Sequence, residues 1–140
     1  MSLFTAIDVA ATSLEAQSVR LNTISSNLAN ANTVSSSDAE AYRAQYPVFE
    51  TLYNEMTANG EGTSAGVQVT EIIQSELPAR REYAPTHPMA DGEGFIYRPA
   101  INSIEEVANM MEASRSYQDA IEAMNTAKQM ILRTLTLGRG

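Results

Sequence analysis

The distribution of helix breakers constrains this 140-residue chain most strongly, because it divides the chain into three parts. All five prolines and five of the seven glycines lie between residues 47 and 99, and the other two glycines stand at positions 138 and 140. Proline and glycine interrupt helices, so the long stretches without them on either side favour continuous helix. We therefore expect two long terminal helices around a shorter, irregular middle.

The predicted fold class is mainly α with a small β module. We expect a helix in residues 1–32, a connector and β-rich module in residues 33–100, and a second helix in residues 101–140. Apolar residues alternate at Val67 and Val69, and an apolar run from Phe95 to Tyr97 follows two glycines, which is typical of short strands. Residues 33–41 are polar and are predicted to form a flexible connector.

The first flank carries apolar residues at the spacing of a coiled coil. One heptad row holds Leu3, Ala10, Ile24 and Ala31, and a second row holds Ile7, Leu14, Leu21 and Leu28. A helix that ran from residue 3 to residue 32 would be about 45 Å long, which is more than a compact domain of this size usually presents in a single helix. We expect this helix to project from the rest of the chain.

The second flank begins with Ser103, Ile104, Glu105 and Glu106, a pattern that matches a capping box between Ser103 and Glu106. Its apolar rows contain Val107, Met110, Tyr117, Ile121, Met124, Ile131 and Leu135. Acidic residues near its start and basic residues near its end also suit the helix dipole. We predict that the two terminal helices pair as a coiled coil.

Two helices alone cannot surround their own apolar rows, so the remaining surface must be buried by other chains or by the middle module. The methionines at positions 110, 111, 124 and 130 fit either an adaptable partner surface or an ordinary helix core, and the length of the helices favours partners. The predicted assembly interface consists of Leu3, Ile7, Leu14, Leu21, Ile24, Leu28, Val107, Met110, Tyr117, Ile121, Met124, Ile131 and Leu135.

Charge and composition exclude several classes of function. The net charge of −8 lacks the basic surface that binds nucleic acid phosphates, so we predict no nucleic acid partner. The absence of cysteine excludes disulfides and thiolate metal sites. Every apolar run is shorter than the ~20 residues of a membrane span. The N-terminal sequence lacks the basic start and apolar core of a Sec signal peptide, so export would need another route.

The chain's single histidine, His87, is the natural starting point for a search for catalysis. With Asp91 and Glu93 it forms a candidate metal or acid-base cluster; alternatively, all three are solvated residues of a turn between Pro85 and Gly94. Metal sites and acid-base centres require more groups than these, which favours the turn. We predict no catalytic residue, no metal ligand and no cofactor, and therefore no enzyme.

Three stretches carry a family resemblance. AQSVRLNTISSNLANANT, residues 16–33, resembles the N-terminal signature of the flagellar rod, hook and hook-associated axial proteins, including the asparagines at positions 27, 30 and 32. YAPTHPMADGEGF, residues 83–95, and the segments MMEASRSYQ and NTAKQMILRTL within residues 110–135 resemble the short proximal rod members of that family. Together they cover about half of the chain. After Thr33 the sequence departs from the family pattern, which commonly has a glycine-containing turn there.

The resemblance implies a structural subunit of the flagellar basal body, whose terminal helices polymerise into a tubular shaft that transmits torque and encloses the export channel. The implied partners are further copies of the chain, other flagellar rod proteins and the flagellar type III export apparatus, and the implied location is the rod that crosses the periplasm. The alternatives are a soluble coiled-coil adaptor and, among enzymes, a metal hydrolase centred on His87.

Overall fold

The computed structural model describes residues 3–54 and 63–138. In chain order the elements are helix α1 (Leu3–Asn30), strands β1 (Gln45–Asn54), β2 (Thr63–Gln74), β3 (Arg80–Tyr83) and β4 (Phe95–Arg98), and helix α2 (Ser103–Leu137). The prediction of two terminal helices around a small β middle is confirmed. Residues 1–2 and 139–140 of the predicted helices, and residues 55–62 of the predicted middle module, lie outside the described residues.

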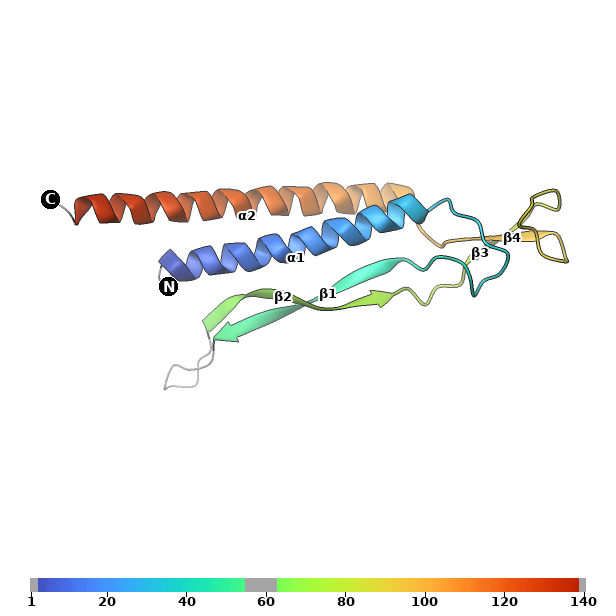
Figure 1. Ribbon diagram of the computed structural model, residues 1–140, viewed down its shortest axis with the longest axis horizontal. Helices are drawn as coiled ribbons and strands as arrows, with labels where there is room; N and C mark the ends of the chain where they lie inside the picture. Colours follow the sequence, from blue (N-terminus) through green and yellow to red (C-terminus); the bar gives the residue numbers. More distant parts are fainter. Residues whose placement is uncertain (1–2, 55–62, 139–140) are drawn as a thin grey trace.

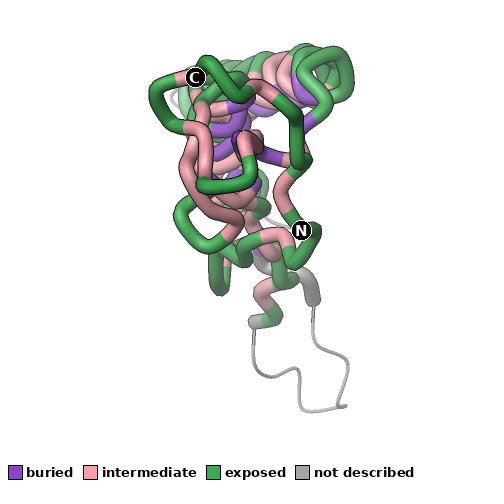
Figure 2. The backbone as a smooth tube through the Cα atoms, turned by 90° about the vertical axis from the view of Figure 1, so that its right-hand side faces the viewer, coloured by how far each residue is buried: buried purple, intermediate pink, exposed green. Residues whose placement is uncertain are grey.

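The molecule is elongated, and α1 lies between α2 on one side and the β1–β2 hairpin on the other (Figure 1). The helices are antiparallel, since Asn27 near the end of α1 contacts Glu106 near the start of α2. The last turns of α2 extend past the beginning of α1 (Figure 1). The β3–β4 ribbon and its loop project at the opposite end of the molecule. In the end-on view, the buried positions gather inside, between the helices and the strands (Figure 2).

The β residues form two separate antiparallel ribbons. In the first, Gln45 pairs with Gln74, and the register shifts after Val48 and again after Leu52. Such irregularities increase the local twist of a hairpin. In the second ribbon, Arg80 pairs with Arg98 and Tyr83 with Phe95. Both regions that we predicted as strands, around Val69 and Ile96, are therefore strands.

The predicted flexible connector of residues 33–41 is held in place by hydrogen bonds. Ser35 and Tyr97 exchange two backbone hydrogen bonds, of 2.9 and 3.0 Å. The Asp38 carboxylate accepts a hydrogen bond of 2.6 Å from the backbone N–H of Ala79 and forms a 2.8 Å ion pair with Arg43. The prediction of flexibility was wrong because polar side chains in this segment satisfy backbone and charged groups of the fold rather than water.

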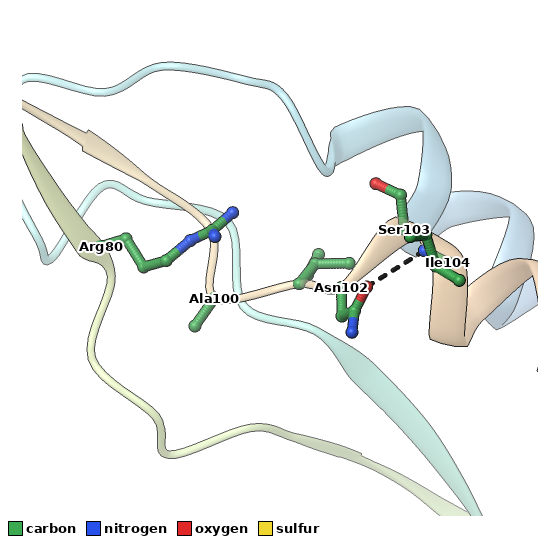
Figure 3. A pocket seen from close by; sticks show the side chains of 6 residues that line it. Arg80, Ala100, Asn102, Ser103 and Ile104 are labelled. Atoms are coloured by element: carbon green, nitrogen blue, oxygen red, sulfur yellow. Dashed lines mark hydrogen bonds between the residues drawn. The ribbon is translucent and has the colours of Figure 1, made fainter.

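The start of α2 differs from the predicted capping box. The N-cap is Asn102, whose side-chain oxygen accepts a hydrogen bond of 3.1 Å from the backbone N–H of Ile104 (Figure 3). Asn102, Ser103 and Ile104 line an open hollow together with Arg80 and Ala100 (Figure 3). The side chain of Glu106 turns away from the cap and contacts Asn27 of α1. Asparagine is as good an N-cap residue as serine, so the cap is Asn102, one residue before the predicted Ser103.

Gly66 allows β2 to approach α1 closely. Its φ angle is +148°, and an added Cβ would lie 2.3 Å from Thr12 Oγ1. We expect Gly66→Ala to lower the free energy of unfolding by about 1–3 kcal/mol, because the new methyl group combines backbone strain with a clash. Thermal unfolding followed by circular dichroism measures the change. Gly92→Ala is the matched control, since nothing lies within 4 Å of its added Cβ; equal stability of the two variants would contradict this account.

Candidate assembly surface

A row of small residues on α2 forms the centre of its contact with α1. The buried residues of α2 recur at every seventh position: Glu106, Ala113, Ala120 and Ala127. Ala113 is completely buried. Alanine lets two helices approach closely but buries little apolar area, so it is a minor contributor to hydrophobic patterns. Sequence analysis missed this row, although the seven-residue repeat of alanine was a signal that could have revealed it.

The predicted interface residues of α1 lie on or beside its contact with α2. Ile24 is buried, and Leu3, Ile7, Leu14, Leu21 and Leu28 are half-buried. The first predicted row is therefore mostly buried, and the second row is half-buried throughout. In the single chain these leucines keep part of their apolar surface accessible.

The predicted interface residues of α2 divide into two groups. Met110, Tyr117, Met124 and Ile131 are half-buried and flank the alanine row. Val107, Ile121 and Leu135 are exposed. The contact with α1 is therefore centred one position before the predicted row of Val107 and Ile121, and that row faces outward in the single chain.

Exposed apolar side chains recur along one side of α2, which we call the outer α2 face. It comprises Ile104, Val107, Met111, Ile121, Leu132 and Leu135. These residues fall on two adjacent heptad rows beside the half-buried row of Met110 and Tyr117, and the same two rows also contain the polar residues Ser114, Gln118, Asn125 and Lys128. Ile104 is 82% exposed and Met111 is 70% exposed. Large exposed apolar side chains gathered on one side of a helix favour an interaction site there.

The opposite side of α2 is polar. Its exposed residues include Glu105, Glu112, Asp119, Arg115 and Glu122. Glu112 forms a 3.2 Å ion pair with Arg20 of α1. Charged side chains remain favourably hydrated there, whereas the outer α2 face gains stability when it is covered. The two sides of one helix thus have different roles, and the outer α2 face is the better candidate for assembly.

A buried polar cluster joins three elements beside the helix contact, and we call it the Asn27 cluster: Asn27, Tyr42, Gln45 and Glu106. Asn27 is completely buried. Its Nδ2 donates to the backbone oxygen of Gln45 at 3.0 Å and to Glu106 Oε2 at 3.2 Å. Its Oδ1 accepts from the backbone N–H of Gln45 at 2.8 Å and from the Tyr42 hydroxyl at 3.0 Å. All the usual hydrogen-bonding capacity of the amide is therefore used.

The environment of the cluster further favours the protonated form of Tyr42. Burial raises the pKa of the Tyr42 hydroxyl, and the neighbouring Glu106 carboxylate raises this pKa further. The hydroxyl therefore remains a donor to Asn27 over the physiological pH range. Sequence analysis placed Asn27 with Asn30 and Asn32 at the end of a helix and missed its tertiary role. By contrast, Asn30 makes a local bond of 2.9 Å to the backbone oxygen of Ser26.

The residues around His87 form a tight turn. His87 Nδ1 accepts a hydrogen bond of 3.1 Å from the backbone N–H of Met89. Asp91 accepts from the backbone N–H groups of Phe95 and Glu93 and from the Tyr97 hydroxyl, and these bonds lower the pKa of its carboxyl group. Glu93 pairs with Arg81. Within residues 3–54 and 63–138, no three His, Cys, Asp or Glu side chains are grouped so that they could hold a metal ion. None of the described helices is long and apolar enough to span a membrane.

Comparison with known proteins identifies relatives along the whole chain. A flagellar basal-body rod protein FlgC of Salmonella typhimurium strain LT2 is 44% identical over 99% of this chain and 100% of the relative. The FlgC proteins of Escherichia coli O157:H7 and of Borreliella burgdorferi strain B31 are 42% and 33% identical, over 99% and 100% of this chain and the full length of each relative. The chain belongs to the FlgC family of flagellar basal-body rod proteins.

Two family profiles cover the elements that form the surfaces described above. The profile described as "Flagella basal body rod protein" matches residues 7–34, which include most of α1 and Asn27. The profile described as "Flagellar basal body rod FlgEFG protein C-terminal" matches residues 93–137, which include β4 and almost all of α2. The two profiles therefore cover most of both helices, the outer α2 face, and Asn27 and Glu106 of the Asn27 cluster.

Proposed function

We propose that the chain is a structural subunit of the flagellar basal-body rod, located in the basal body and assembled with other rod subunits. The observation that carries this proposal is the likeness to named rod proteins over nearly the full length of both chains. The outer α2 face supports it from the structure, since exposed apolar side chains that recur on one side of a helix favour burial against partner chains.

The adhesion between subunits comes from burial of the outer α2 face and the half-buried leucines of α1. Complete burial of a leucine or methionine side chain contributes roughly 1.5–3 kcal/mol. Each subunit carries many such side chains, and the contact repeats along a polymer, so modest contacts add up to a stiff shaft. The assembly interface is the predicted set, except for Ile24, which is already buried within the single chain, together with Ile104, Met111 and Leu132. The helices of neighbouring subunits pack as coiled coils, in which a second chain covers the apolar side chains of α2 that the contact with α1 leaves exposed.

The three parts of the chain have separate tasks in this proposal. The helices of residues 1–32 and 101–140 form the polymerising unit around a channel, and the module of residues 33–100 lies outside it. Torque passes along the packed helices. The subunit reaches the rod through the flagellar type III export apparatus, in keeping with the family resemblance of its helices. The role is mechanical and needs no catalysis.

A tagged copy in a motile bacterium that lacks its own gene tests the proposal. We expect the copy to restore swimming and to appear in purified basal bodies, at the rod, by immunoelectron microscopy. A copy that stays in the soluble fraction while cells swim would contradict the proposal and favour the coiled-coil adaptor.

The same cells test the mechanical role directly. His87→Ala is expected to leave swimming unchanged, because His87 bonds to the adjacent turn and the neighbouring Asp91 is engaged by that turn. Swimming speed and the metal content of the purified protein are the measurements. A stoichiometric metal that is lost together with motility in His87→Ala would show that the role is not purely mechanical.

A further inference from the structure

The attachment of the β1–β2 hairpin to the helices has two described polar contacts of unequal strength. At mid-length, Thr12 Oγ1 of α1 accepts one hydrogen bond of 3.3 Å from the backbone N–H of Val67. At the base of the hairpin, Asn27 bonds to both the N–H and the C=O of Gln45, the first residue of β1. A two-point attachment fixes both the position and the direction of the backbone, whereas a single bond allows rotation about it.

The same amide also holds α2, because its second N–H donates to Glu106. Glu106 is 4% exposed, and a buried carboxylate requires a hydrogen-bond donor. One side chain of α1 thus orients the first residue of the hairpin and satisfies the buried charge of α2. Loss of the amide would weaken both attachments at once.

We propose that Asn27 is the positioning residue that fixes the hairpin at one angle to the helix pair, with Glu106 as its acidic partner. Directional hydrogen bonds define an angle, which the small apolar contacts of Ala31, Ala44 and Ile101 nearby do not. Given the proposed function, a fixed angle means that every subunit presents its helices and hairpin identically to its neighbours. That consequence rests on the proposed function, but the positioning role itself is a property of the single chain.

Paired spin labels on the purified full-length chain measure this angle. The chain has no cysteine, so Glu71→Cys on β2 and Glu122→Cys on α2, both exposed, give two unique labelling sites. We expect a single narrow distance distribution in the labelled parent and loss of that single peak in Asn27→Ala. Asn30→Ala is the matched control. It also removes an asparagine side chain near the end of α1, but the hydrogen bond that is lost is local to that helix. This variant should keep the narrow peak.

An exchange of partners separates positioning from general loss of stability. Asn27→Asp places two carboxylates together and is expected to abolish the narrow peak. Asn27→Asp with Glu106→Gln restores one amide and one carboxylate in exchanged places and relieves the repulsion, but an aspartate at position 27 cannot donate to the Gln45 carbonyl, so the narrow peak is expected to stay lost. The positioning role is overturned by a parent that already shows a broad distribution, by a narrow peak in Asn27→Ala, or by a double variant that recovers the narrow peak without a donor to the Gln45 carbonyl. Because these measurements use the isolated chain, they do not depend on whether it is part of a rod.

Discussion

Met111→Asp is expected to stop rod assembly and leave cells non-motile, while the purified subunit keeps the stability of the parent. Met111 is 70% exposed in the single chain, so the aspartate remains hydrated and the free energy of unfolding changes by less than about 0.5 kcal/mol. In a rod that covers the outer α2 face, the same carboxylate is buried without a partner at a cost of several kcal/mol in every subunit. Swimming assays, electron microscopy of basal bodies and thermal unfolding measure the three effects.

Gln129→Asp provides the matched control for this prediction. It introduces the same side chain at an exposed position on the polar side of the same helix. We expect these cells to swim. Normal rods in Met111→Asp cells would show that the outer α2 face stays open in the assembly. Equal failure of the two variants would show that the outer α2 face and the polar side of α2 do not differ in their importance for assembly.

Ala113→Leu is expected to have the largest effect on the subunit itself. Ala113 is completely buried in the alanine row, where a larger side chain must push α1 and α2 apart. Overpacking of this kind costs about 1–3 kcal/mol, and the cost is repeated in each assembled subunit. We expect a lower melting temperature in the purified chain and impaired swimming in cells.

Ala108→Leu tests whether this loss comes from the helix contact. Ala108 is exposed on the same helix, and leucine has a high helix propensity, so the substitution adds bulk without a packing clash. We expect its melting temperature to stay close to that of the parent. If Ala113→Leu were as stable as Ala108→Leu, the alanine row would not be the close contact between the helices.

The positions of the helices were predictable because the evidence for them is local. Prolines and glycines between residues 47 and 99 break helices wherever they fall in a fold, and α1 and α2 occupy the flanks that lack them. The short strands around Val69 and Ile96 were also indicated by local patterns. The register shifts in the β1–β2 hairpin were not, because they depend on how two distant segments fit together.

The details of the helix contact were less predictable because they depend on tertiary packing. Hydrophobicity alone predicted Val107 and Ile121 in the helix contact. In the structure the buried residues are the alanines of the row one position earlier, because small side chains allow the helices to pack closely. In the same way, the pattern of asparagines gave no reason to distinguish Asn27 from Asn30. Their different roles arise because Gln45 and Glu106 are brought to Asn27 by the fold, from 18 and 79 residues away. The two terminal helices lie side by side, and that they pair as a coiled coil stays a prediction.

The accessibility of a single thiol on the outer α2 face tests the central claim most directly. Since the natural chain has no cysteine, Met111→Cys introduces a unique reactive group. The measurement is the rate of maleimide labelling in purified subunits, in intact basal bodies and in basal bodies dissociated by denaturant. We predict rapid labelling of free and dissociated subunits and strong protection in intact basal bodies, because neighbouring subunits cover this face. Equally rapid labelling in intact basal bodies would contradict the account.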